Sequence, residues 1–158
     1  MKLIPLTKGV SVQVDDHWFE ELNQHKWYAQ KGRNTYYAAR KVQKNNIITQ
    51  IYMHRVIMNT PENRGVDHID LNGLNCLEKN MRNSTSSQNG ANKKPRGRSK
   101  YMGVSINNTN GHTYIQAQIN INKRLTYLGH FPTEEEAARA YDAKAKEVHG
   151  EFANLNFK

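Results

Sequence analysis

Cysteine and long apolar runs are the features that this sequence most clearly lacks. Its 158 residues include one cysteine, Cys76, and nowhere do 18 apolar residues follow one another. A single cysteine excludes an intrachain disulfide framework and a cysteine-based zinc site such as a zinc knuckle. The missing apolar run excludes a membrane-spanning helix, and the first nine residues, MKLIPLTKG, lack the apolar segment of a signal peptide. We therefore expect a cytoplasmic protein that does not span a membrane.

Acidic residues are in the minority, and apolar residues make up only 37% of the chain. One domain or two small ones with small cores are therefore expected. The 14 Asp and Glu against 23 Lys and Arg give a net charge of +9, which indicates an anionic partner, either nucleic acid or a membrane surface. The excess is concentrated in KKPRGRSK (93–100), with five basic residues and no acid. We interpret this segment as a linker, either a solvated tether or an arm that contacts phosphates.

Residues 101–132 have the pattern of a three-stranded antiparallel sheet. Residues 102–106 predict a short strand, and NNTNG (107–111) predicts a turn. Residues 114–121 then alternate strictly between apolar and polar side chains, and a tight turn leads into a third strand at 124–128. Such a sheet would have one apolar face, which must be covered.

A helix is predicted to cover that face. Thr133 is a good N-cap, Glu136 completes a capping box with it, and Gly150 should end the helix. Residues 101–132 contain two basic residues and no acid, whereas residues 133–151 contain six acids and three basic residues. We therefore expect the sheet to face an anionic partner and the helix to face away from it.

Three segments here resemble the AP2/ERF DNA-binding domain. They are YMGV (101–104), YLGHFPTEEEAARAYD (127–142) and ANLNF (153–157). The resemblance extends over about 57 residues, and it implies a sheet that lies in the DNA major groove with the helix packed behind it.

The chain departs from that family at positions that matter for base recognition. Met102 and Ser105 replace the two arginines of the family's YRGVR start, and Ile115 stands where tryptophan is usual. Because fewer arginines leave fewer bidentate contacts to guanine, the GC-rich target of the plant factors is not assumed here. The basic run, counted as a phosphate-contacting arm, contributes Lys93, Lys94, Arg96, Arg98 and Lys100. The resemblance, aligned without gaps, implies that the residues facing bases and backbone are Ser105, Gln116, Gln118, Asn120, Lys123, Arg124 and Tyr127.

The N-terminal region predicts a small β-rich fold. Residues 4–14 indicate a strand pair, residues 15–22 a short helix, and residues 35–42 and 47–55 two strands joined around a pair of asparagines. The residues expected to fill its core are Trp18, Trp27 and Tyr28. The residues expected to be structural or phosphate-contacting rather than catalytic are His17, His54 and Arg55.

The stretch VDHIDLNG (66–73) places an Asp-His pair where the flanking apolar residues indicate a strand. Asn80 follows His68 by twelve residues, and Asn89 follows by a further nine. Residues 66–89 as a whole resemble the HNH endonuclease motif, in the His-Asn-Asn variant of phage and intron-associated homing endonucleases. The resemblance implies two strands and a helix around one divalent metal ion, Mg²⁺ or Mn²⁺.

By this resemblance His68 is the general base, Asp67 and Asn89 hold the metal, and Asn80 orients the His68 ring. A histidine near its ordinary pKa suits work on a water molecule, and carboxylate and amide oxygens suit a hard cation. The metal would act as a Lewis acid on the scissile phosphate. Neighbours on a regular strand point to opposite faces, so Asp67 and His68 can converge only if the strand bends near DLNG (70–73).

We therefore predict an α+β chain with an HNH nuclease domain at 1–92 (motif 66–92), a basic linker at 93–100 and an AP2/ERF-like domain at 101–158. In the nuclease domain a small β-rich region leads into the ββα-metal motif. In the AP2-like domain a three-stranded antiparallel sheet packs on one helix. The function expected is metal-dependent, site-specific cleavage of double-stranded DNA by a homing-type endonuclease. It would act as a monomer in the cytoplasm of a phage host or bacterium. The alternative is a non-cleaving DNA-binding protein or transcription regulator with a degenerate HNH fold.

Overall fold

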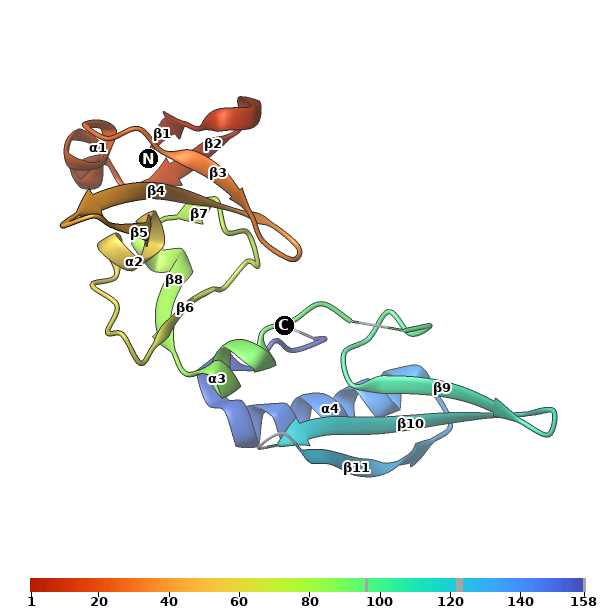
Figure 1. The fold of residues 1–158 in the computed structure, drawn as a ribbon. Helices are drawn as coiled ribbons and strands as arrows, with labels where there is room; N and C mark the ends of the chain where they lie inside the picture. The colour runs from red at the N-terminus through yellow and green to blue at the C-terminus, as the bar shows by residue number, and fades with distance from the viewer. Residues whose placement is uncertain (96, 122–123, 158) are drawn as a thin grey trace. The chain divides into compact units, whose positions relative to one another are not determined.

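The computed structural model describes residues 1–95, 97–121 and 124–157. The chain is a mixed α+β protein that divides into two compact units, residues 1–86 and 87–158 (Figure 1). The finer division into 1–92, 93–100 and 101–158 stays a prediction. In the described part of the chain, no helix combines the length and the apolar character needed to cross a membrane. Two predicted DNA-contacting residues, Arg96 and Lys123, lie outside the described residues.

The first unit is built from short strands and short helices around one core. Its elements are β1 (Lys2–Pro5), η1 (Thr7–Gly9), β2 (Ser11–Val14), α1 (Asp16–Asn23), β3 (Tyr28–Lys31), β4 (Tyr36–Lys44), β5 (Ile47–Tyr52), α2 (Met53–Ile57), β6 (Gly65–His68), β7 (Asn75–Cys76), η2 (Glu78–Asn80) and β8 (Met81–Ser84). They form a β1-β2-β7 sheet, a β3-β4-β5 sheet and a β6-β8 pair. The predicted strand pair at 4–14 and the helix at 15–22 are confirmed as β1, β2 and α1.

The core of this unit explains the lone cysteine. Cys76 is fully buried beside Leu22 and Met53, and burial raises the pKa of its thiol to about 12. It therefore packs as a small apolar side chain and is not poised as a nucleophile. Trp27 lies in the same core, whereas Trp18 packs at its edge.

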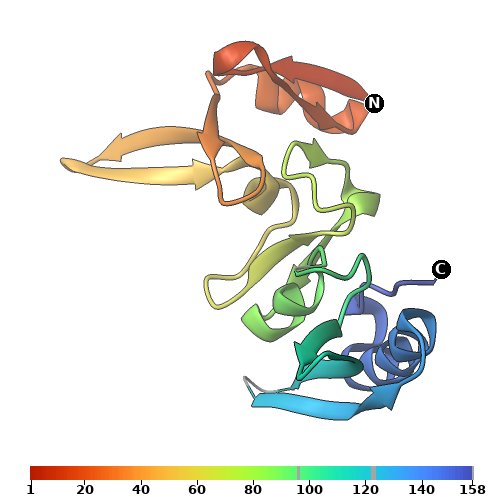
Figure 2. The same cartoon turned by 90° about the vertical axis from the view of Figure 1, so that its right-hand side faces the viewer.

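The β4–β5 hairpin projects from the unit as a two-stranded ribbon (Figure 2, orange to yellow). Asn45 and Asn46 both have positive φ, 48° and 61°, which is the geometry of the tight turn that such asparagine pairs favour. The predicted strand at 47–55 is wrong at its end, because α2 begins at Met53. A helix buries Met53 and Ile57, which are four residues apart, on one face.

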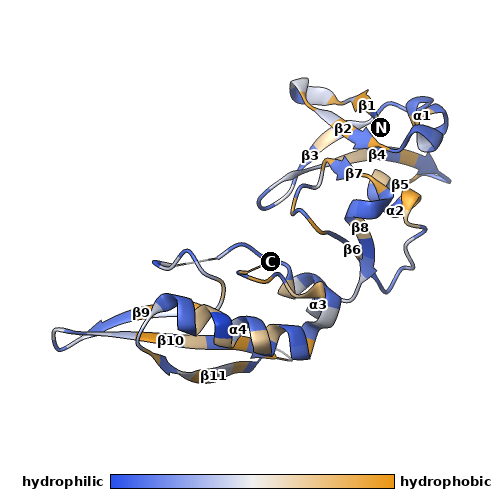
Figure 3. Cartoon of the chain, turned by 180° about the vertical axis from the view of Figure 1, so that it is seen from behind, coloured by the Kyte–Doolittle hydropathy of each residue, from blue (hydrophilic) through white to orange (hydrophobic). Residues whose placement is uncertain are grey.

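The second unit has the predicted sheet-and-helix layout. α3 (Ser86–Ala91) begins at the boundary between the two units. The three strands β9 (Val104–Thr109), β10 (His112–Ile121) and β11 (Arg124–Phe131) form an antiparallel sheet in the order β11-β10-β9. α4 (Glu134–His149) lies along one face of that sheet (Figure 3), and η3 (Gly150–Phe152) follows it. The turn between β9 and β10 is tighter than expected, because Asn110 and Gly111 alone reverse the chain with positive φ.

The caps and glycines of this unit follow the sequence signals. The Thr133 hydroxyl accepts a hydrogen bond from the Glu136 backbone at 3.2 Å, and Gly150 ends α4 with φ 53°. Gly103 has φ 71°, and a Cβ there would overlap the Tyr141 ring, so only glycine fits beneath α4. Asp142 of α4 accepts hydrogen bonds from Asn156 and Phe157, which fixes the closing segment against the helix.

Candidate active site

Asp67 is held by a cross-strand arginine. β6 and β8 pair antiparallel with Asp67 opposite Arg82, so the two side chains lie on the same face of the pair. Asp67 is 1% exposed, and its Oδ2 accepts hydrogen bonds from Arg82 Nε at 2.9 Å and Nη2 at 2.7 Å. The sequence reading missed Arg82, although it lies within the recognised motif. The signal that could have found it is the strand register, which places the two opposite charges side by side.

His68 is the last residue of β6 and is 6% exposed. Its ring lies edge-on to that of His54, with centroids 5.2 Å apart, and is tilted against the Tyr37 ring at 5.9 Å. Burial lowers the pKa of His68 below its ordinary value, and the nearby Asp70 and Asp67 carboxylates oppose that shift. At neutral pH the imidazole is therefore uncharged, which is the form that can accept a proton.

Two tyrosines and His54 form an aromatic wall on the side of His68. Tyr37 comes from β4, and Tyr52 and His54 come from the junction of β5 and α2. His54 stacks on the Tyr52 ring at 5.4 Å with an interplanar angle of 14°, and it meets Tyr37 edge-on. Burial, with smaller effects from His68 and Arg55, lowers the pKa of His54 to about 3. His54 thus lies beside the predicted base, a position that its spacing in the sequence did not indicate.

Arg55, the neighbour of His54, has a structural role. Its guanidinium donates to the backbone carbonyls of Arg64, Pro61 and Thr60 at 2.8, 2.9 and 3.3 Å. These bonds close the loop between α2 and β6. His17, the third residue of this set, lies on the surface with its Nε2 3.6 Å from a carboxylate oxygen of Glu78.

Asn80 supports the loop that follows His68. Its side-chain oxygen accepts from the Asp70 backbone N–H at 3.1 Å, and its amide nitrogen donates to Asp70 Oδ1 and to the Asn75 carbonyl, each at 2.9 Å. Its own carbonyl accepts from Ile69 at 2.8 Å. The predicted bond from Asn80 to the His68 ring is therefore replaced by support of the backbone next to it. The physical reason is that the loop turns sharply at Leu71, with φ 64°, and needs those partners.

Asp70 is the centre of this loop. Burial acts to raise the pKa of its carboxyl, but hydrogen bonds from Asn72, Asn75 and Asn80, together with the His68 charge, lower it overall. The predicted bend near residues 70–73 is present at Leu71, but it comes after His68, since the β6–β8 ladder keeps its register through His68. In a ladder of that kind Asp67 and His68 point to opposite faces.

The two residues predicted to hold the metal, Asp67 and Asn89, lie in different units of the chain. Asp67 belongs to the first unit, whereas Asn89 is an exposed residue of α3 in the second unit. Among the described residues, no group of three or more His, Cys, Asp or Glu could hold a metal ion. A buried carboxylate that a guanidinium already orients is the kind of hard oxygen ligand that suits Mg²⁺ or Mn²⁺, which keep several water ligands. The same donor set does not fit structural zinc.

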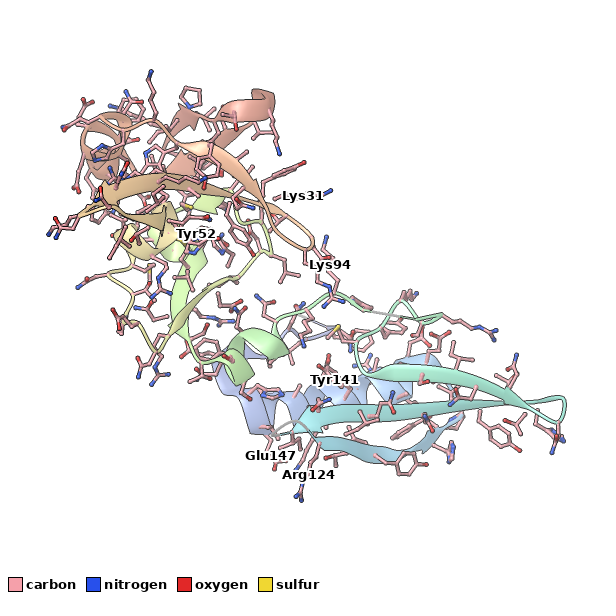
Figure 4. All side chains as sticks on the ribbon, in the orientation of Figure 1. Lys31, Tyr52, Lys94, Arg124, Tyr141 and Glu147 are labelled. Atoms are coloured by element: carbon pink, nitrogen blue, oxygen red, sulfur yellow. The ribbon has the colours of Figure 1, made fainter. Side chains whose placement is uncertain are left out.

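The predicted DNA-contacting residues lie in the second unit. The described positions of the basic segment, Lys93, Lys94, Arg98 and Lys100, are exposed, while its Ser99 is buried and donates to Glu134 at 2.6 Å. Gln116 and Gln118 on β10 are half-buried, and Asn120 is exposed. Ser105 on β9 pairs with Gln116, and Tyr127 on β11 pairs with Gln118, so these residues share the sheet face opposite α4. Arg124 begins β11 and extends outward from it (Figure 4).

Comparison with known proteins covers both units. No protein-family model matches the chain. An uncharacterized HNH endonuclease of Acanthamoeba polyphaga mimivirus is 33% identical over 150 residues, which are 94% of this chain and 76% of that protein. The ethylene-responsive transcription factor WRI1 of Arabidopsis thaliana is 42% identical over 62 residues, and an APETALA2-like protein of rice is 41% identical over 63. These matches cover about 40% of this chain and 14% of each plant protein. Because the viral relative is 33% identical and is matched over 94% of this chain and 76% of its own length, the chain belongs to the HNH endonuclease family.

Proposed function

We propose that this protein is a metal-dependent, site-specific DNA endonuclease of the homing type. The observation that supports this most directly is His68, an uncharged histidine enclosed at the end of β6, next in sequence to a buried aspartate whose side chain points to the other face of the strand. A purely structural strand end has no need for either group, because burying ionisable side chains costs free energy.

The chain's own residues would divide the chemistry as follows. His68 accepts a proton from a water molecule through one ring nitrogen while that water attacks the scissile phosphorus. The bond from phosphorus to the 3′ oxygen breaks, and that oxygen leaves and takes up a proton. The aromatic wall and the loop at 70–75 hold the His68 ring in place while this happens.

Asp67 and Asn89 are the residues that would hold the Mg²⁺ or Mn²⁺. When bound, such a cation offsets the negative charge that builds up on the phosphate and the leaving oxygen. Arg82 orients the Asp67 carboxylate toward one side through Oδ2. A single centre of this kind in a monomer would cut one strand in each binding pose.

DNA binding would draw on both units. Residues 22–61 contain seven Lys and Arg and no acid, and the β4–β5 hairpin contributes Arg40, Lys41 and Lys44 from this stretch. The segment 93–100 adds five basic residues. Phosphate contacts from these segments would supply affinity, and the AP2-like sheet would supply position.

One observation favours a second candidate, a DNA-binding protein that does not cleave. Asp67 Oδ2 accepts both Arg82 bonds, and an ion pair of this kind can serve strand pairing alone. Both candidates predict DNA binding that weakens with salt, and only the endonuclease predicts metal-dependent strand breaks.

The test is to incubate the protein with mixed phage and bacterial genomic DNA and Mg²⁺ or Mn²⁺, and to sequence the new ends. EDTA and the His68→Ala variant should abolish the ends. His17→Ala, which changes a surface histidine of the same unit, should leave them intact. Ends clustered at one motif and lost in both controls would establish the endonuclease. Retained binding without metal-dependent ends would leave the non-cleaving protein.

A further inference from the structure

The outer face of the β9-β10-β11 sheet is a surface of neutral polar and apolar groups. Across the described residues of its three strands, the formal charge is that of Arg124 alone, at the start of β11. Leu125 and Tyr127 are 64% and 54% exposed on this side. No acidic residue lies in the strands to repel a polyanion.

Three amide side chains run along the centre of that face. Gln116, Gln118 and Asn120 alternate on β10 with Ala117 and Ile119, which are buried toward α4. Within the described part of the chain, these three amides have no hydrogen-bond partner in the protein. They therefore present both a donor and an acceptor to whatever lies on the sheet.

Neighbouring strands complete the pattern. Leu125 pairs with Asn120, and Tyr127 pairs with Gln118. The Leu125 side chain therefore lies beside the Asn120 amide, and the Tyr127 ring lies beside the Gln118 amide. The Tyr127 hydroxyl is hydrogen bonded to His130 Nδ1 at 2.6 Å, which holds the exposed ring on this face. The pairing with β11 shifts register between Ala117 and Gln118, and such an irregularity increases the local twist of the strands.

The spacing of the amides suits a base-pair ladder. Residues on one face of a strand repeat about every 6.8 Å, which is two steps of the roughly 3.4 Å rise along one DNA strand. An amide of Asn or Gln matches adenine N6 and N7 in the major groove, and an apolar side chain matches the thymine methyl group. Guanine is read best by arginine or lysine, which this face lacks between its ends.

We propose that this sheet selects A·T base pairs, with Gln116 and Gln118 bonding to adenine and Leu125 contacting a thymine methyl group. This inference rests on the proposed function, since it assumes that the sheet lies in the major groove. Arg124, at the edge of the face, contacts a phosphate and contributes affinity without base preference.

The test is selection of binding sites from random double-stranded oligonucleotides by the full chain, in EDTA so that no cleavage occurs. The selected sites should share A·T pairs at positions two steps apart. Gln116→Ala and Gln118→Ala should each lose the preference at one position. Each should weaken binding to the selected site by about 5- to 100-fold, with little change on random DNA. Gln24→Ala, an exposed amide at the end of α1, is the matched control and should change nothing.

A second measurement separates base reading from charge. Replacing adenine by 7-deaza-adenine at the preferred positions should weaken the wild type and leave Gln116→Ala unaffected there. Arg124→Ala should lower the salt slope by about one contact and keep the same site. Selected sites rich in G·C, or sites unchanged in both glutamine variants, would overturn the A·T inference while DNA binding stands. Failure to select any DNA would overturn the inference together with the binding half of the proposed function.

Discussion

Removing Arg82 should expose how strongly the first unit depends on one buried ion pair. Asp67 is 1% exposed and accepts two bonds from the guanidinium, whereas Arg82 is 17% exposed. Arg82→Ala takes away the countercharge of a carboxylate that water hardly reaches. Breaking a buried pair from one side costs about 3–5 kcal/mol, and the partial exposure of Arg82 places this case near 3 kcal/mol.

That loss is large for a unit of this size. Domains are stable by about 0.05–0.15 kcal/mol per residue, so removal of about 3 kcal/mol takes a substantial part of the total for residues 1–86. The double variant Asp67→Asn with Arg82→Ala should recover more than half of it, because no buried charge remains. The free energy of unfolding of Arg82→Lys should lie between those of the wild type and Arg82→Ala, since a lysine supplies the charge but not the two directed hydrogen bonds.

The measurement is urea unfolding at pH 7, followed by tryptophan fluorescence. The proteins compared are the wild type, the single variants Asp67→Asn and Arg82→Ala, and the double variant. Trp18 and Trp27 both belong to the first unit and report on it. A coupling free energy near 2 kcal/mol or above is expected from the cycle. An Arg82→Ala loss below about 0.5 kcal/mol, or a double variant no more stable than Arg82→Ala, would refute the assignment of this pair as a buried interaction.

Three further predictions concern other parts of the chain. The pKa of His54 in the folded state, about 3, lies below the unfolded value of 6.5, so the unfolded chain binds the extra proton and the free energy of unfolding should fall by about 1.4 kcal/mol per pH unit as pH drops between these two values. In urea unfolding from pH 6 to 4, His54→Phe should show a shallower dependence of stability on pH than the wild type. An equal dependence would contradict the prediction. Gly103→Ala should lower the free energy of unfolding by about 2 kcal/mol or more, because the new Cβ meets the Tyr141 ring at a residue with positive φ. Gly111→Ala, also at positive φ but in open space, should cost about 1 kcal/mol. Thermal melting of both variants is the measurement, and equal costs would show that the ring contact is unimportant. Asn80→Asp should slow DNA cleavage and loosen the loop at residues 70–75, because it places a second carboxylate against Asp70. Hydrogen exchange of the loop amides should become faster in this variant. Unchanged protection of these amides would argue against the support of the loop by Asn80.

The second unit could be predicted almost completely from the sequence, because its signals are local. Strict alternation along residues 114–121 fixes which side chains of β10 face the helix, and Thr133 and Gly150 mark both ends of α4. Such features depend on neighbours within a few residues, and therefore they survive without knowledge of the fold. The turn at Asn110-Gly111 was misjudged only in length.

The candidate site could be predicted only in part, because its surroundings come from distant segments. His68 and Asp67 were recognisable from their motif, yet the partner of each is set by packing. Arg82 reaches Asp67 through strand register, and His54 reaches His68 through a helix that replaced the end of a predicted strand. Neither contact has a spacing signature, so neither could be found without the fold.

Under the proposed function, the distribution of charge along the chain would let affinity and selectivity come from different residues. Basic residues are concentrated in residues 22–61 and 93–100, while the described residues of β9, β10 and β11 contain a single formal charge, that of Arg124. Contacts to phosphates bind any sequence equally, so the basic residues of those two segments would add affinity at both correct and incorrect sites. A neutral sheet adds free energy only where its amides meet matching base edges, and it leaves those amides desolvated and unpaired elsewhere. The separation of charge from amides along this sequence is therefore what the proposed site-specific endonuclease would require: binding strength would depend on salt, and discrimination would come from the few uncharged side chains on β10 and β11.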